Sequence, residues 1–184
     1  MIIITIIALL AVPVLSSQNI LAQAKFLTYE NKDFGFSILY PSGWQKEEGI
    51  PSKSSNINIV ASFAKRNGSL QSIYTEADLY IRTEDFLGKN ITLEEFAQLQ
   101  RAYSSSFLAV SSFNEFKTII GSKPAWQLDY NFKGFGGTIR HGINTLIIND
   151  GIGYSIVFTA DKEKYEKYFP IAHKTINSFQ IRTK

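Results

Sequence analysis

The side chains best suited to chemistry in this 184-residue chain are its two histidines, His141 and His173, and its acidic residues. Cysteine is absent, which excludes thiolate catalysis, disulfides, cysteine-ligated zinc and a lipid anchor on a lipobox cysteine. The sequence also lacks the G-x-S-x-G nucleophile elbow, the H-E-x-x-H zinc motif, the P-loop and EF-hand spacing. We therefore expect no enzymatic activity and a structural or surface role for each histidine. A hydrolase with an unrecognised Ser–His–acid site is the minor alternative.

A second set of polar residues lies on segments that alternate like strands. Asp78 and Asp129 each have apolar neighbours, so each is expected on the polar face of its strand. Arg82, Arg140 and Asn144 occur on similar segments and are candidates to join them. If a helix covers that face, these groups must pair with one another, which is the interpretation we favour. If the face is open, the same five residues form a site for a small polar ligand.

Metal binding is left open by the sequence. Acidic residues come in three close pairs: Glu30 with Asp33, Glu47 with Glu48, and Glu84 with Asp85. Calcium requires six or more oxygen ligands at one point, so such pairs are expected to be hydrated surface.

One loop carries an isolated aromatic residue. Phe135 lies in the run Lys133-Gly134-Phe135-Gly136-Gly137, among residues of little bulk or high polarity. Its ring either folds back onto the sheet or forms an exposed contact for a protein partner or a membrane surface.

These residues must be positioned by strands in the first half of the chain. Period-two alternation predicts strands over 34–40, 57–63 and 77–82, and Asn67-Gly68 is a strong turn signal between the last two. Thr92 and Glu95 form a capping box, which predicts a helix from Leu93 to about Val110. The residues predicted to form its apolar stripe are Leu93, Phe96, Ala97, Tyr103 and Phe107.

The second half returns to period two. Strands are predicted over 113–120, 126–132, 138–148 and 152–160, with a turn at 121–124 and a tight hairpin at Asn149-Asp150-Gly151. Asp161 is the predicted N-cap of a last helix, in which Pro170 should cause a kink or begin a new segment.

Strands joined by tight turns imply an antiparallel sheet. The fold class is therefore α+β: a mainly antiparallel β-sheet of six to seven strands flanked by helices, in a single domain over 26–181. The net charge of +3, with scattered basic residues, does not indicate nucleic-acid binding.

The N-terminal segment has the features of a targeting sequence. An apolar run from Ile2 to Leu15 is followed by polar residues and then by Ala22-Gln23-Ala24, an A-x-A cleavage pattern. We expect residues 1–24 to be a signal peptide, with a mature chain that begins at Lys25; an uncleaved N-terminal membrane anchor is the alternative. Either way the domain acts outside the cytoplasm, secreted or on the outer face of the cytoplasmic membrane. Sequons at Asn67 and Asn90 agree with export.

Several segments, taken in order, resemble the PsbP family of extrinsic photosystem proteins. These are GFSILYP (35–41) followed by Ser-Gly-Trp44, then GSKPAWQLDY (121–130), GYSIVFTA (153–160) and YEKYFPIAHKTINSFQI (165–181). The resemblance covers nearly the whole mature chain. It extends to LpqN-type lipoproteins and the Ran-binding factor Mog, and it implies an antiparallel sheet with helices on both faces, a PsbP-like α/β/α sandwich.

The same resemblance implies a non-enzymatic accessory role, without a cofactor, in a membrane-associated complex. In the family that role is support of photosystem II with retention of calcium, so calcium is implied by resemblance alone. The family docks through an N-terminal extension that has no counterpart between Lys25 and Thr28, so we expect a different protein partner. A carrier of a small ligand or lipid, with a pocket between sheet and helix, is the alternative.

The turn at Pro41-Ser42-Gly43-Trp44 is expected to be structural. Pro41 cannot donate to a strand ladder and so ends its strand. Trp44 is then expected to bury its ring against the end of the sheet, although stacking on a ligand is the other use of such a ring.

Overall fold

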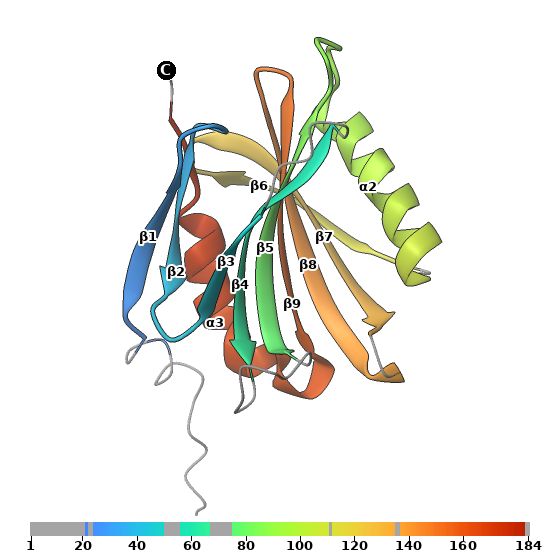
Figure 1. Ribbon diagram of the computed structural model, residues 1–184. Helices are drawn as coiled ribbons and strands as arrows, with labels where there is room; N and C mark the ends of the chain where they lie inside the picture. Colours follow the sequence, from blue (N-terminus) through green and yellow to red (C-terminus); the bar gives the residue numbers. More distant parts are fainter. Residues whose placement is uncertain are drawn as a thin grey trace, which may run out of the picture.

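The computed structural model of the protein describes residues 21, 24–49, 56–66, 75–110, 112–134 and 137–182 (Figure 1). Its strands are β1 (Phe26–Asn31), β2 (Phe36–Pro41), β3 (Gln45–Glu48), β4 (Ile57–Arg66), β5 (Thr75–Asp85), β6 (Asn114–Ile120), β7 (Lys123–Lys133), β8 (Ile139–Asn149), β9 (Ile152–Asp161) and β10 (Gln180–Ile181). Its long helices are α2 (Leu93–Leu108) and α3 (Tyr165–Asn177), and a 3-10 turn, η2 (Lys162–Lys164), precedes α3.

The strands form two antiparallel sheets. The larger has seven strands in the order β3-β4-β5-β9-β8-β7-β6, and the smaller has three in the order β1-β2-β10. The predicted α+β class is confirmed. The segment predicted over 34–40 lies in the smaller sheet, between β1 and β10, which the sequence pattern did not reveal. The strand β3 also went unpredicted, because its sequence QKEE is a charged edge strand rather than an alternating one.

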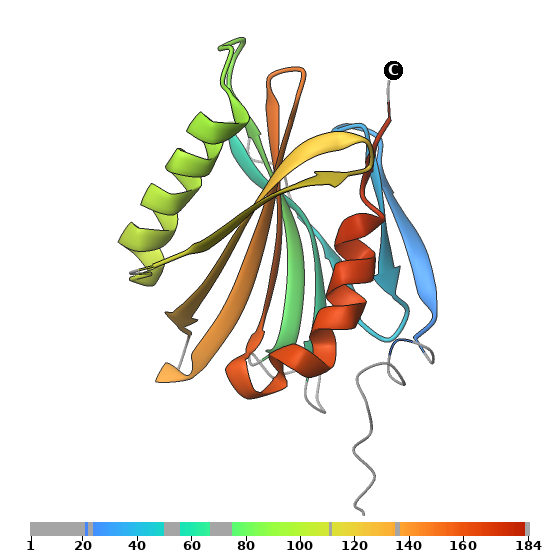
Figure 2. The ribbon, with the colours of Figure 1, turned by 180° about the vertical axis from the view of Figure 1, so that it is seen from behind.

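The two long helices cover opposite faces of the large sheet. Along β8, Ile143 and Ile147 belong to one buried cluster and Leu146 to another, because neighbouring side chains alternate between the faces. The first cluster includes Ile171 and Ile176 of α3, which lies behind the strands in Figure 1 and in front of them in Figure 2.

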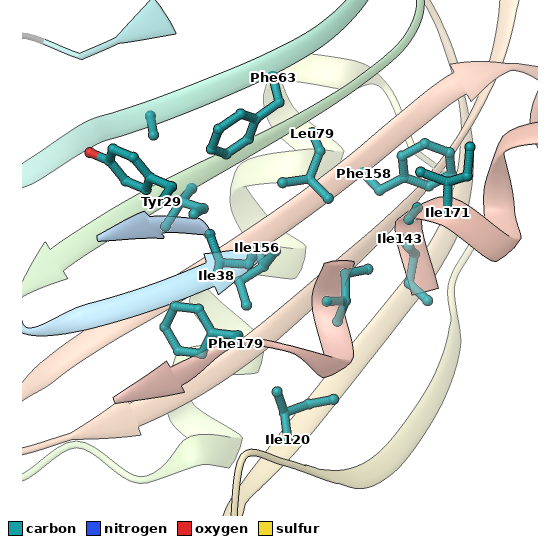
Figure 3. Packing of buried hydrophobic residues seen from close by; sticks show 14 of the residues in the cluster. Tyr29, Ile38, Phe63, Leu79, Ile120, Ile143, Ile156, Phe158, Ile171 and Phe179 are labelled. Atoms are coloured by element: carbon teal, nitrogen blue, oxygen red, sulfur yellow. The ribbon is translucent and has the colours of Figure 1, made fainter. Parts of the chain in front are cut away.

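The main core fills the space between the large sheet, α3 and the small sheet. Figure 3 shows its packing, with Ile38 and Phe179 beside Ile156, and Leu79 beside Phe158. The second core lies beneath α2 and includes Phe86, Phe96, Leu128 and Leu146. All buried residues of both cores fall between Tyr29 and Phe179, so a chain that starts at Ala24 keeps every one of them.

Tight turns of the predicted kind join the central strands. Asp150 and Gly151 have φ of 50° and 76°, and Asn149 pairs with Ile152, so the expected hairpin is confirmed. Gly121 and Ser122 make a similar turn between β6 and β7. The Asn67-Gly68 turn lies outside the described residues.

The helix α2 begins where it was predicted to begin, but it buries a different face from the predicted one. The Thr92 and Glu95 capping box is present, and Ala109 ends the helix in the left-handed conformation. Tyr103 and Phe107, predicted on the buried stripe, are 43% and 74% exposed, whereas Gln100 and Ser104 are buried. The prediction was wrong because α2 packs on a partly polar surface of the sheet, which accepts polar side chains.

The last helix also departs from expectation. Asp161 makes no side-chain cap, because its carboxylate accepts a hydrogen bond from Arg140. The α-helix begins at Tyr165 and Pro170 lies inside one continuous element, so Pro170 does not begin a new segment, and the kink stays a prediction. Among the helices of the described ranges, none is long and apolar enough to cross a bilayer.

Candidate functional site

A polar group with many hydrogen bonds centres on Arg140, at the start of β8. Its Nη2 lies 2.7 Å from Asp78 Oδ2 and its Nη1 lies 3.0 Å from Asp161 Oδ1. Nη1 also donates to the carbonyl of Thr75, while Nη2 and Nε share the hydroxyl of Thr159. All five guanidinium donors are therefore used, and the group is mostly buried.

The carboxylate of Asp78 is held in turn by two hydroxyl groups. Asp78 accepts hydrogen bonds from Thr75 and Thr159 at 2.8 Å and 3.0 Å. Gly134 makes room for the arginine, because a Cβ there would lie 2.7 Å from Arg140 Cδ. With one guanidinium and two carboxylates, the cluster formed by Asp78, Arg140 and Asp161 carries a net charge of −1. We call it the Arg140 cluster.

A cavity of about 350 Å³ opens beside this cluster. Its charged end is the Arg140 cluster, and its apolar end is formed by Leu108 of α2 and by Tyr80, Tyr130 and Phe132. Burial raises the pKa of Tyr130 to about 12 and also raises the pKa of Tyr80, although the charge of Arg82 offsets part of each shift. Both phenols therefore stay neutral at physiological pH and present a hydroxyl rather than a charge.

A second polar group lies under the middle of α2. Arg82, on β5, donates a hydrogen bond to Gln100 of α2, which donates in turn to Glu84 at 3.3 Å. The guanidinium also lies 4.9 Å from the ring centroid of Tyr103. Burial raises the pKa of Glu84, and the positive charge of Arg82 partly counters that shift.

Four of the five predicted polar residues share the α2 face of the sheet. Asp78 and Arg140 pair there, Arg82 binds Gln100, and Asn144 lies on β8, the strand of Arg140, with Oδ1 unpartnered among the described residues. The structure brings Asp78 and Arg140 together at the cavity, but Arg82 and Asn144 do not line it.

Asp129 lies on the other face of the sheet. Its carboxylate is 3.0 Å from Nε2 of His141, whose ring stacks on Tyr165 at 3.8 Å. The reason is register: the apolar side chains of β7, among them Leu128, face α2, where β5 presents its polar side chains. The polar side chains of β5 and those of β7 therefore lie on opposite faces of the sheet.

The fold and this geometry were compared with known proteins. A model of the PsbP family matches residues 24–181. The chain belongs to the PsbP family. Among curated proteins, none matches the sequence.

Solved structures with a similar fold come from a cyanobacterium, a mycobacterium and a yeast. Cyanobacterial PsbP (CyanoP) of Synechocystis sp. PCC 6803 is 15% identical with a TM-score of 0.62, over 86% of this chain and 93% of that one. LpqN of Mycobacterium tuberculosis, described as involved in cell envelope biogenesis, is 11% identical with a TM-score of 0.57, over 93% and 99%. The Ran-binding protein Mog1p of Saccharomyces cerevisiae is 7% identical with a TM-score of 0.57, over 86% and 96%. At these identities the likeness shows the fold alone.

Resemblance to the PsbP family implies calcium, but the described ranges contain no suitable set of ligands for this ion. No group of three or more acidic or histidine side chains converges there. The carboxylates of Asp78 and Asp161 are committed to Arg140, and Glu30, Glu47 and Glu48 pair with Arg182, Arg66 and Lys46. The residues present do not fit the ion, which needs six or more oxygens.

The turn after β2 buries its two outer residues, Pro41 and Trp44, and exposes Ser42 and Gly43. Pro41 ends β2 opposite Phe26, and Trp44 is 7% exposed, with its ring perpendicular to that of Tyr168 at 6.2 Å. Phe135 lies outside the described residues, as does the sequon at Asn67. Asn90 is exposed ahead of α2.

The surface most suited to a partner was not predicted from the sequence. Leu99, Tyr103 and Phe107 form an exposed apolar stripe on α2, with Leu99 46% exposed. The four-residue spacing of these apolar side chains was visible in the sequence. Whether they face the sheet or the solvent depended on where Gln100 and Ser104 pack.

Proposed function

We propose that this PsbP-family protein is exported and non-enzymatic, and that it binds a protein partner in a membrane-associated complex outside the cytoplasm. The observation that carries the proposal is the orientation of α2. This helix buries Gln100 and Ser104 and exposes Leu99, Tyr103 and Phe107, which we call the α2 stripe. Exposed apolar groups gathered on one element mark interaction surfaces more often than chance exposure does.

The α2 stripe is held in one arrangement. The rings of Tyr103 and Phe107 lie 4.7 Å apart, and Arg82 supports Tyr103 from beneath. The capping box fixes the first turn of the helix. A rigid aromatic surface loses little conformational entropy on binding, which favours affinity.

The cavity beside Leu108 extends this surface. Phe107 is adjacent in sequence to Leu108, which lines the cavity together with Tyr130 and Phe132. The other end of the cavity carries the net negative charge of the Arg140 cluster. We infer that a partner inserts a basic or polar side chain there while its apolar residues cover the α2 stripe.

The polar groups support binding rather than catalysis. The donors of Arg140 are all used within the domain, so the guanidinium is not free to polarise a substrate. His141 is engaged by Asp129 and Tyr165 on the opposite face, and His173 contacts Phe169 and Asn177. Within the described ranges no serine or threonine hydroxyl bonds to either histidine.

The family and its structural relatives support the same class of function. Mog1p is a Ran-binding protein, and LpqN is involved in cell envelope biogenesis. A protein-binding role in the envelope is thus compatible with this fold.

The test is co-purification after crosslinking in native envelopes. Phe107→Ser should reduce recovery of the partner at least about tenfold, because a central aromatic anchor contributes about 2 kcal/mol or more. Ile119→Ser on β6 is the matched control, since Ile119 is 71% exposed but lies away from α2. Both variants should keep the wild-type melting temperature. Recovery of the same partner by Phe107→Ser, or of none by the wild type, would contradict the proposal.

A small-ligand carrier remains the second candidate, because the cavity at the end of α2 is of ligand size. Native mass spectrometry of protein purified from its own envelope would show a bound small molecule if this function holds. Leu108→Trp, which narrows the cavity, should then release that molecule without affecting partner recovery.

A further inference from the structure

A second cavity lies on the other side of the large sheet, at the end of the molecule where β1 begins and β4 ends. This is the lower end in Figures 1 and 2, where α3 also begins. The cavity measures about 450 Å³. Its walls come from the start of β1, the turn between β2 and β3, the end of β4 and the first half of α3.

The walls are aromatic and apolar and are tightly held. Trp44 and Tyr168 pack edge to face, and Ile171 is buried next to them. Trp44 is 7% exposed and its indole N–H forms no hydrogen bond among the described residues, but that nitrogen keeps some contact with solvent. A polar group on a ligand can replace water as its acceptor.

The charges that line the cavity are all positive. Lys25, Lys65 and Lys167 contribute to its lining and no carboxylate does. Lys25 and Lys65 form no ion pair within the described ranges, and the ammonium of Lys167 lies 4.9 Å from the ring centroid of Tyr168. Three like charges around one cavity repel one another, and an anion would relieve that repulsion.

A carboxylate that bonds to the lining residue Tyr168 is already paired with a lysine. Glu76 accepts hydrogen bonds from Tyr168 and, at 2.9 Å, from Lys164. These contacts lower the pKa of Glu76, the bond from Tyr168 most of all. Lys167 has a smaller electrostatic effect on the same carboxylate, and the three lysines of the cavity form no ion pair within the described ranges.

We propose that this cavity binds the phosphate headgroup of an anionic membrane lipid. The positive charges of the lysines favour a phosphate, and the aromatic wall offers an apolar surface to the glycerol and upper acyl region of the lipid. The position of the cavity in the chain favours a membrane as the source of that phosphate. Ala24 and Lys25 line it, so in a chain that keeps the apolar run Ile2–Leu15 the cavity is joined to that run by about ten residues, which span at most about 35 Å.

This binding is separate from that of the proposed partner. The cavity lies on the α3 side of the large sheet and the α2 stripe on the opposite side, so a membrane and a protein can be held together. Loss of one should leave the other unchanged, and the two proposals fail independently.

The first test is co-sedimentation of the chain from Ala24 with vesicles. Phosphatidylcholine vesicles containing phosphatidylglycerol should bind the protein, and pure phosphatidylcholine vesicles should bind it weakly. Each basic residue near an anionic surface is worth about fivefold in affinity, so Lys65→Gln/Lys167→Gln should weaken binding about thirtyfold. The charge-preserving Lys65→Arg/Lys167→Arg should retain it.

The matched control is Lys133→Gln/Lys162→Gln. It removes the same charge from the same end of the molecule, outside the cavity, and should weaken binding much less than the cavity variant. Equal loss in both would overturn the proposal, because the end as a whole rather than the cavity would then attract the membrane. Equal binding to both vesicle types, or none to either, would overturn it as well.

The second test reports on the cavity itself. Trp126→Phe leaves Trp44 as the single indole, since the chain has two tryptophans. Phosphatidylglycerol vesicles should protect Trp44 from acrylamide quenching, and the double glutamine variant should abolish that protection. Equal protection by inorganic phosphate alone would assign the cavity to a soluble anion and overturn the lipid proposal.

Discussion

Arg140 joins three strands through its side chain. It links β8 to Asp78 on β5 and to Asp161 at the end of β9, and it also binds the backbone of Thr75. A guanidinium suits this position because its planar donors reach several acceptors at once, which a lysine ammonium cannot do with the same geometry. The charged end of the cavity beside α2 depends on this one residue.

Arg140→Met should therefore lower the free energy of unfolding by about 3–5 kcal/mol, because it leaves two carboxylates partly buried without a cation. Urea denaturation at neutral pH measures this. Arg182→Met is the control: Arg182 pairs with Glu30 at the exposed surface, and its loss should cost less than about 1 kcal/mol. Similar costs for the two variants would show that the Arg140 cluster contributes no more than a surface pair.

Two glutamates should give opposite pH dependences. Burial raises the pKa of Glu84 above its ordinary value of 4.5, so ionisation in the folded state costs stability at neutral pH. Glu84→Gln should be more stable than the wild type at pH 7, and the difference should vanish as the pH falls below about 4.5, where Glu84 is protonated in both states.

The pKa of Glu76 is lowered from the same ordinary value, chiefly by the hydrogen bond from Tyr168. Its contribution to stability is present above pH 4.5 and is lost as the pH falls through the folded-state pKa. Glu76→Gln should be less stable than the wild type at pH 7 and approach it in acid. Unfolding free energies measured from pH 3 to 7 test both variants, and curves of the same sign would refute the assignments.

At the scale of elements, the helix α2 shows where pattern reasoning succeeds and where it fails. Its start was predictable because a capping box is local chemistry between Thr92 and Glu95. Its buried face was not, because the sheet beneath offers Arg82 and Tyr130, which accept Gln100 and Ser104 as partners. An apolar stripe on a helix predicts burial only when the surface that it meets is apolar.

The contact between α2 and the sheet depends on a glycine in β9. A Cβ at Gly153 would lie 2.7 Å from Phe96 Cζ, so any larger residue must displace that ring. Gly153→Ala should lower the free energy of unfolding by about 1–3 kcal/mol through overpacking, measured by urea denaturation.

Gly43→Ala is the control, because no atom lies within 4 Å of the added Cβ. If both alanine variants were equally stable, Phe96 would have room to move and α2 would be held elsewhere.

At the scale of the whole molecule, the sandwich separates two surfaces. The α2 stripe and its cavity lie on one side of the large sheet, and the lysine-lined cavity lies on the α3 side at the end where the N-terminal segment joins the domain. A protein with this arrangement can lie against a membrane and hold a partner away from it. Residues of the two surfaces such as Phe107 and Lys65 lie outside the buried cores, so these residues can change without unfolding the domain.

Export and cleavage are the predictions for the N-terminal segment. Cleavage after Ala24 should give a mature protein that begins at Lys25, recovered outside the cytoplasm. Mass spectrometry of the intact protein from envelope and medium fractions tests this. A chain that keeps Met1 and fractionates with membranes would identify an anchor instead, and a cytoplasmic chain would contradict export.

The sequence by itself determined the elements that rest on local chemistry. The period-two segments, the Asp150-Gly151 hairpin and the capping box at Thr92 all follow from contacts between near neighbours, and they predicted an antiparallel α+β fold. The PsbP resemblance, confirmed over residues 24–181, rests on the order of those segments.

Only the tertiary structure decided which faces meet. Both faces of the large sheet are covered, so the alternation along a strand does not say whether its polar residues face α2 or α3. Asp78 and Asp129 thus lie on opposite faces, and Tyr103 and Phe107 point outward although their spacing predicts burial. These outcomes depend on strand register and on pairs such as Asp78 with Arg140, which are 62 residues apart. Contacts over such separations form only when the whole chain folds.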